Sequence, residues 1–394
     1  MLAIKGAKTW TLGSRGTLDS CVILIDGERI RAVESRMDIP AEAEVIDATR
    51  LTIVPGFVDA HSHLGLASNG LAVDDGTEYT EQVTPHLMAL DALDPISQSL
   101  KTSLMGGVTT SALLPGAAMS FGPITENITV MPGMASVLKI KQTYPEVLRE
   151  KAGIKMAFGN HPKRAVEEKK TAPVTRMNIV AMVRESLRGA QTYAAKKAKG
   201  DEAVDLKKEA LLGLLESRYP AHVHVHKLRD IELVLSVAEE FGFKVVLHHV
   251  TEGHLAADML AEKQIPCAVG PIAFTRRGTE LANLNLATPG ILSSAGAKVA
   301  IVSDFPTFPA HYLPIHAGMA CREGMKYEDA LSAITLSAAQ ILEVDDEVGS
   351  LEPGKYADLV AFEGDPLQAM SKVRLVLASG NIIRDSIRTK GGVV

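Results

Sequence analysis

The segment Val54–His63, which reads VPGFVDAHSH, decides how the rest of the chain is interpreted. An apolar run leads into two histidines one residue apart, as at the end of a buried strand. Side chains alternate along a strand, so His61 and His63 project to the same side. Two imidazoles at this spacing can share one divalent cation, held about 2.0–2.1 Å from each nitrogen. The HxH pair is weak evidence alone, and its position at the end of a strand strengthens the metal hypothesis.

Downstream of this segment, short apolar runs alternate with amphipathic helical stretches, the pattern of β–α units. Eight parallel strands spread over about 295 residues predict an α/β fold of the TIM type, a (β/α)8 barrel whose catalytic groups lie at the C-terminal ends of the strands. The expected strands are Leu51–Asp59, Gly107–Leu113, one within Asn127–Ile140, Ile154–Phe158, Ala221–His226, Lys244–His249, Ile265–Val269 and Lys298–Ser303. Expected helices include Asn178–Lys199, Asp230–Phe241 and His254–Glu262.

Both ends of the chain have a β-rich character. Short runs of alternating apolar and polar residues, separated by turn residues, make up residues 1–53, and the same pattern occurs in residues 349–394. Neither end can bury a core alone, because isolated hairpins are marginally stable. We therefore expect one small composite β-sandwich domain built from residues 1–53 and 349–394, with the barrel of residues 54–348 inserted.

Composition excludes several classes of protein. With 46% hydrophobic and 22% charged residues, the 394-residue chain is an ordinary globular protein. A net charge of -6 argues against nucleic-acid or anionic-membrane binding. Three scattered cysteines favour a reducing compartment, and neither a signal peptide nor a long apolar run is apparent. We expect a cytoplasmic homo-oligomer.

Histidines are concentrated in one region: six of the twelve lie between positions 222 and 254. His222, His224 and His226 share one face of the expected fifth strand, where unsatisfied imidazoles would pack poorly. For His222 we favour a structural hydrogen bond. On the next strand His248 and His249 point to opposite faces, so with His249 facing the barrel centre we expect His248 to point outward to a structural hydrogen bond. His254 is placed at the start of the following helix.

Asp304 follows the apolar run of the expected eighth strand. A carboxylate there is costly unless it is paired or bound to metal. The alternative is that Asp304 caps the next helix, since aspartate is a favoured N-cap.

The chain resembles the amidohydrolase superfamily of metal-dependent hydrolases, especially its imidazolonepropionase-like branch. The resemblance rests on Val54–His63, on Gly107–Thr110, on Ser303–Asp304 and on Gly349–Lys355 leading into Ala357–Val360. These motifs span nearly the whole chain, and their order and spacing make the resemblance specific.

The resemblance implies a ligand set and a mechanism. It places a metal-binding histidine on strand five, with His224 preferred and His226 as the alternative, and matches His249 to the strand-six histidine. The metal ligands would be His61, His63, His224, His249 and Asp304. Asp304 would also act as general base toward a metal-activated water. His249 would polarise the scissile carbonyl if one metal is bound, or bind the second metal if there are two.

The expected fourth strand leaves the metal count open between one and two ions. Binuclear relatives bridge their metals with a carboxylated lysine or a glutamate on this strand. Here Lys155 begins the expected strand rather than ending it, Asn160 stands where relatives often carry Glu, and His161 is adjacent. Lys139 is a further possibility.

Candidate substrate contacts are His226, His86 in the loop after strand one and Arg276 after strand seven, whose guanidinium could bind a carboxylate. The resulting hypothesis is a hydrolase of a C–N bond in an amide, lactam or cyclic amide of a small molecule. Zinc is the expected ion, with iron or manganese as alternatives. Deamination of an amidine-type ring is the enzymatic alternative, and a catalytically inactive oligomeric scaffold is the alternative from another class.

Overall fold

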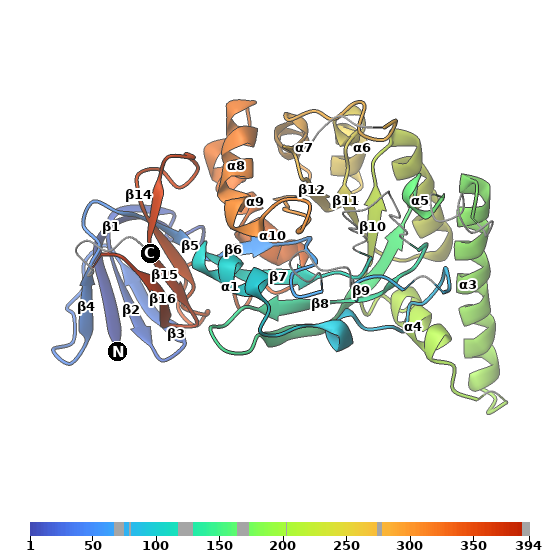
Figure 1. Cartoon of the computed structure of the whole chain (residues 1–394), viewed down its shortest axis with the longest axis horizontal. Helices are drawn as coiled ribbons and strands as arrows, with labels where there is room; N and C mark the ends of the chain where they lie inside the picture. Colours follow the sequence, from blue (N-terminus) through green and yellow to red (C-terminus); the bar gives the residue numbers. More distant parts are fainter. Residues whose placement is uncertain are drawn as a thin grey trace.

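The computed structural model describes residues 1–66, 75–78, 80–116, 129–163, 173–201, 203–273 and 278–387. Figure 1 shows a β domain, formed by both ends of the chain, beside a larger barrel that helices flank at the top and right of the view. The predicted fold class is confirmed.

The barrel wall contains the eight expected strands in sequential order. Backbone contacts between the ends of the first and last strands complete it: Ser62 forms a parallel bridge with Phe305, and Asp304 N donates to His61 O over 3.0 Å. The strands are β6 (Phe57–Asp59), β7 (Val108–Leu113), β8 (Gly133–Lys139), β9 (Glu146–Ala157), β10 (Ala221–Val225), β11 (Val245–His249), β12 (Cys267–Val269) and β13 (Val299–Ile301).

One strand departs from the expected all-parallel wall. β8 pairs antiparallel with both β7 and β9. Only residues 140–145 separate β8 from β9, and a parallel neighbour needs a crossover of a dozen residues or more. The β8–β9 connection is therefore a hairpin. It also makes β9 longer than the expected Ile154–Phe158, so Lys155 lies near the C-terminal end of its strand.

Helices cover the outside of the barrel (Figure 1). In α5 the buried side chains include Ile231, Val234 and Leu235, at helical spacing on one face, and the helix ends at Gly242 in the left-handed conformation. No helix in the described part of the chain combines the length and apolar character needed to cross a membrane. The helices are η1 (Ala89–Ala92), α1 (Gln98–Met105), α3 (Arg176–Lys197), α4 (Leu206–Leu215), α5 (Leu228–Phe241), η2 (Gly253–Leu255), α6 (Ala257–Glu262), α7 (Thr288–Ala295), η3 (Ala310–Tyr312), α8 (Leu313–Arg322), α9 (Tyr327–Ala333) and α10 (Leu336–Ile341).

The β domain is one continuous eight-stranded sheet that joins both ends of the chain. The middle of this sheet is the antiparallel pairing of β5 with β14, one strand from each end. Its strands are β1 (Leu2–Trp10), β2 (Thr17–Asp26), β3 (Arg29–Glu34), β4 (Glu44–Asp47), β5 (Thr52–Pro55), β14 (Leu359–Glu363), β15 (Lys372–Ala378) and β16 (Asn381–Asp385). The domain limits proposed from the sequence stay predictions.

Gly56 is the point where the chain leaves one sheet and enters the other. The expected strand Leu51–Asp59 is divided here into β5 and β6. A Cβ atom at Gly56 would lie 2.3 Å from Thr109 Oγ1 and 2.9 Å from Asp358 Cβ, so only glycine fits. The PGF sequence therefore holds the start of the barrel tightly against the β domain.

A buried ion pair crosses the same junction. Lys139 Nζ, on β8, lies 2.9 Å from Asp358 Oδ1, and both side chains are almost completely buried. Asp358 also accepts from Ser379 N at 2.8 Å and Thr109 Oγ1 at 3.2 Å. Lys139, one of the proposed metal bridges, is thus a structural residue that ties the barrel to the β domain.

Candidate metal centre

The ends of three barrel strands bring together the first group of predicted ligands. His61 follows β6, His249 ends β11 and Asp304 follows β13, and one ligand atom of each lies within 4.8 Å of the others. His61 Nε2 is 3.3 Å from Asp304 Oδ1, and His63 Nε2 is 3.4 Å from the same oxygen. His61 and His63 therefore do face the same side, as the alternation of the strand predicts.

Two of these residues have an uncommon backbone conformation. The φ angles of His249 and Asp304 are 68° and 52°, in the left-handed region that non-glycine residues seldom adopt. Such conformations occur where a functional arrangement imposes them, at a cost of about 1–3 kcal/mol each. Here they direct both side chains toward His61.

Hydrogen bonds fix which nitrogen of two imidazoles carries the proton. His63 Nδ1 lies 2.5 Å from Leu114 O, and His249 Nδ1 lies 2.7 Å from Gly270 O. A carbonyl oxygen only accepts, so in both rings Nδ1 donates. A ring whose one proton is on Nδ1 presents a lone pair at Nε2, the atom that a cation binds.

Hydrogen bonds among His222, His248 and His61 likewise fix which nitrogen of His61 carries the proton. His222 Nε2 lies 3.3 Å from Ala152 O and must donate to it, which makes His222 Nδ1 an acceptor. His248 Nε2 donates to that nitrogen over 2.8 Å. His248 Nδ1 then accepts from His61 Nδ1 over 2.7 Å, and His61 Nε2 is left with a lone pair directed at Asp304.

His248 was expected to point away from the barrel centre toward a structural hydrogen bond. The structural hydrogen bond is present, but the direction differs: His248 is buried directly behind His61, and its hydrogen bonds connect His61 to His222. The expected structural role of His222 is confirmed. His254 contacts Thr288 over 3.1 Å from η2, at the start of the next helical segment as expected.

Burial keeps the imidazoles of His61 and His249 neutral. Burial and the nearby Lys155 amine hold the pKa of His61 well below its usual range, and burial lowers the pKa of His249 to about 4. Asp304 has a pKa well below its ordinary value, so at neutral pH the neutral His61 and His249 rings lie around an ionised carboxylate.

Lys155 lies within the same buried region. It is almost completely buried, its Nζ atom has no hydrogen-bond partner, and it stands opposite His222 in the pairing of β9 with β10. Burial lowers its pKa to about 7, so a large fraction of the amine is neutral at physiological pH. An uncharged amine near the end of the fourth barrel strand is able to react.

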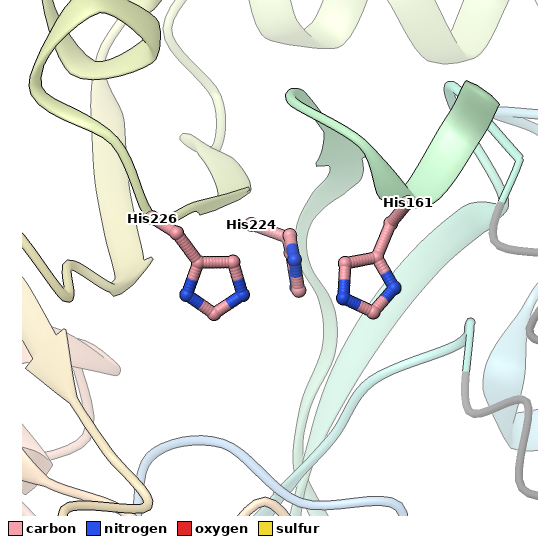
Figure 2. A group of neighbouring side chains, drawn as sticks. All are labelled: His161, His224 and His226. Atoms are coloured by element: carbon pink, nitrogen blue, oxygen red, sulfur yellow. The ribbon is translucent and has the colours of Figure 1, made fainter. Parts of the chain in front are cut away.

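A second group of histidines adjoins the first. His161, His224 and His226 place one ligand nitrogen each within 4.8 Å of one another (Figure 2). The His224 ring contacts that of His249, with centroids 4.3 Å apart, so the two groups are neighbours. His224 thus groups with His161 and His226 while also contacting His249, and its predicted role as a metal ligand stays a prediction.

The other candidates have different surroundings. Asn160 donates from its backbone N to Glu280 Oε1 over 2.6 Å and from Nδ2 to Thr279 Oγ1 over 3.1 Å, so it stabilises a loop. His86 lies between Val83 and Met88, which form isolated β-bridges with Met131 and Met134. Its role toward substrate stays a prediction. Arg276 lies outside the described residues.

Comparisons with known proteins point to the amidohydrolases. The amidohydrolase family model matches residues 52–384. A solved amidohydrolase structure from Thermotoga maritima is 35% identical, with a TM-score of 0.90 over 98% of this chain and 100% of that chain. The amidohydrolase tasK of Hapsidospora irregularis is 26% identical over 88% of this chain, which spans only 38% of that longer protein. An imidazolonepropionase from Symbiobacterium thermophilum is 26% identical over 88% of this chain and 83% of its own length.

Proposed function

Because the chain belongs to the amidohydrolase family, a family of hydrolases acting on C–N bonds, we propose that it hydrolyses an amide, lactam or cyclic amide of a small molecule with a divalent cation at His61, His63, His249 and Asp304. Zinc is the proposed ion, because neutral imidazoles with one carboxylate suit it. The imidazolonepropionase relatives support a cyclic amide as one substrate class to test.

One observation carries this proposal. The Nε2 lone pairs of His61 and His63 both face Asp304 Oδ1, at 3.3 and 3.4 Å. Three acceptor atoms directed at one another repel unless a proton or a cation lies between them. The depressed pKa of His61 disfavours the proton, so the arrangement fits a cation.

His249 fits the same role. Its Nε2 atom is buried without a hydrogen-bond partner, an arrangement that costs free energy unless a ligand satisfies it. Since Nδ1 donates to Gly270 O, Nε2 has no hydrogen to offer a substrate carbonyl. We therefore favour His249 as a ligand over the alternative in which it polarises the scissile bond.

A bound cation would lower the pKa of water toward 7 and polarise a substrate carbonyl. The Asp304 carboxylate, ionised at neutral pH, accepts the proton of the attacking water and returns it to the leaving nitrogen. His248 and His222 hold the proton of His61 on Nδ1, so that Nε2 stays directed at the site. Burial of these groups limits competing water.

Lys155 extends this ligand set. We propose that its neutral amine adds carbon dioxide, forming an N–C bond and releasing one proton, to give a carboxylate for the cation. Its burial, its partnerless Nζ atom and its pKa of about 7 support this reaction. Labelling with ¹³C-bicarbonate and detecting a carbamate carbon by NMR tests it, and Lys155→Met should lose the signal.

The hydrolase proposal is tested with Asp304→Asn. Cyclic amides, acyl amino acids and dipeptides are incubated with metal-reconstituted enzyme, and release of amine or ammonia is followed. Removing a catalytic proton acceptor should lower turnover by a factor of about 10²–10⁴. Near-normal turnover in a correctly folded Asp304→Asn variant would contradict the assignment.

A further inference from the structure

We propose that Asp59 and Ser303 form a buried pair that fixes the spacing of the metal ligands where the first and last strands of the barrel meet. The ligands concerned are His61, which follows β6, and Asp304, which follows β13. Asp59 and Ser303 are positioning residues, because they act through the chain segments that carry these ligands and not through contact with the cation. The inference rests on the proposed function, since the ligands are those of the proposed cation.

The Asp59 carboxylate accepts hydrogen bonds from both of the segments that meet here. On its own segment, Oδ1 accepts from His61 N over 3.3 Å. From the other segment, the same oxygen accepts from Ser303 N over 3.2 Å, and Oδ2 accepts from the Ser303 hydroxyl. One side chain therefore holds the backbone of His61 and the backbone of the residue that precedes Asp304.

Ser303 transmits this constraint to Asp304, the next residue. The Ser303 hydroxyl donates to Asp59, and its Oγ atom also accepts from Phe305 N over 3.1 Å. The hydroxyl is therefore bonded to the residue that follows Asp304 as well as to the opposite segment. Asp304 has a φ of 52°, and such a conformation persists only where the surrounding structure imposes it. The hydrogen bonds of Ser303 are part of what imposes it.

Backbone hydrogen bonds beside the pair set the register of the two segments. Asp304 N donates to His61 O over 3.0 Å, and His63 N donates to Phe305 O over 3.0 Å. In this register the Nε2 atoms of His61 and His63 lie 3.3 and 3.4 Å from Asp304 Oδ1. Zinc binds nitrogen and oxygen ligands at about 2.0–2.2 Å, so a small shift between the segments changes its coordination.

Burial indicates that the carboxylate of Asp59 has a specific role. Asp59 and Ser303 are both fully buried. Among the described residues, the hydrogen-bond partners of Asp59 are two backbone amides and a hydroxyl, and no lysine or arginine pairs with it. A carboxylate without a cationic partner is costly to bury, and an apolar side chain would avoid that cost. The hydrogen bonds that join the two segments are therefore what the carboxylate contributes.

Two substitutions break the same hydrogen bond from opposite sides. Asp59→Asn keeps the shape of the side chain and one oxygen for the backbone amides, but an NH2 group replaces the oxygen that accepts from the Ser303 hydroxyl. Ser303→Ala removes the hydroxyl and leaves the carboxylate with both backbone amides. If the bond positions the ligands, the two variants should have the same effect on metal binding.

The test measures Zn²⁺ affinity and the Co²⁺ absorption spectrum of full-length, chelator-stripped protein. Loss of a group that orients metal ligands weakens metal binding by about 10–100-fold. We expect this loss, with a changed Co²⁺ spectrum, in Asp59→Asn and in Ser303→Ala, and the double variant should lose about as much as the weaker-binding single variant. Ser136→Ala is the matched control, because Ser136 is also buried and donates to Glu150 O on the β8–β9 hairpin. It should bind both metals as the wild type does.

The outcomes separate this inference from the proposed function. A pair that only stabilises the fold would lower the free energy of unfolding and leave the Co²⁺ spectrum of the folded protein unchanged, which would refute the positioning role. The hydrolase proposal then stands if Asp304→Asn still weakens Zn²⁺ binding. If the wild type binds no zinc, both proposals fail. Circular dichroism establishes folding, and Ser303→Ala alone decides the outcome if Asp59→Asn is unfolded.

Discussion

Two buried lysines of the barrel wall should respond in opposite ways to the same substitution. Lys139 is paired with Asp358, whereas the Nζ atom of Lys155 has no hydrogen-bond partner. Methionine preserves most of the length and volume of lysine and removes its charge. We expect Lys139→Met to destabilise the metal-free protein and Lys155→Met to stabilise it.

The magnitudes follow from the surroundings of each amine. Breaking a buried ion pair by removing one partner costs about 3–5 kcal/mol, and Lys139→Met would leave the Asp358 carboxylate in this position. Burial lowers the pKa of Lys155 from 10.5 to about 7. At about 1.4 kcal/mol per unit, this penalises the folded state by up to about 4 kcal/mol at pH 7. The folded protein holds fewer protons than the unfolded chain, so the penalty is full below pH 7 and disappears as the pH rises toward 10.5.

Urea unfolding of chelator-treated protein at pH 7, in buffer depleted of carbon dioxide, measures both effects. Zinc binding by the same variants provides the functional comparison: Lys155→Met should bind the cation more weakly, and Lys139→Met should bind it normally. If Lys155→Met destabilises as much as Lys139→Met, the Lys155 amine has an unrecognised partner, and the carboxylation proposed for it loses its basis.

Two further predictions concern groups around the site and between the two terminal segments of the β domain. Replacing His248 with Phe removes the acceptor that holds the proton of His61 on Nδ1. The loss of such a partner weakens metal binding by about 10–100-fold. Titration with Zn²⁺ measures the affinity, and an unchanged affinity would contradict the role of His248 in orienting His61. Glu352 has its pKa lowered to about 2, first by the Ser350 hydroxyl and then by Ser14 N and Lys355. A folded-state pKa below the unfolded value stabilises the fold above pH 4.5, and the contribution is lost as the pH falls toward 2. Glu352→Gln should therefore lower the free energy of unfolding by about 1–2 kcal/mol at pH 7 after allowance for solvent screening. Urea titrations should show this difference shrinking as the pH falls from 4.5 toward 2, and a constant difference would contradict the assignment.

The strand pattern predicted the barrel because each strand has its own local signal. Buried strands such as Ala221–Val225 and Val245–His249 are short apolar runs bounded by turns, so their positions could be inferred from the sequence. The direction of β8 could not, because direction depends on the connection to β9 and not on the apolar run itself. The first half of β9, with its charged residues, has no apolar periodicity, and its extent follows from pairing with β8.

The same limit applied to the site. The alternation of β6 placed His61 and His63 on one side, and Asp304 was marked by its position after an apolar strand. Side-chain contacts between different strands could not be predicted, because nothing local in the sequence indicates that His248 lies behind His61 or that His161 contacts His224. The unusual density of histidines between positions 222 and 254 was the available signal, and it indicated a cluster without indicating how the cluster divides.

The buried polar atoms of this cluster affect the stability of the whole protein. Folding buries the Nε2 atoms of His224 and His249 and the Nζ atom of Lys155 without hydrogen-bond partners. Each such group costs about 1–3 kcal/mol, which is large against a typical net stability of about 5–15 kcal/mol. A cation that binds only the folded chain recovers this cost and adds stability in proportion to the logarithm of its concentration over its Kd. If the proposed cation binds, the histidine cluster couples folding to metal supply, and chelation should lower the stability of the barrel as well as its activity.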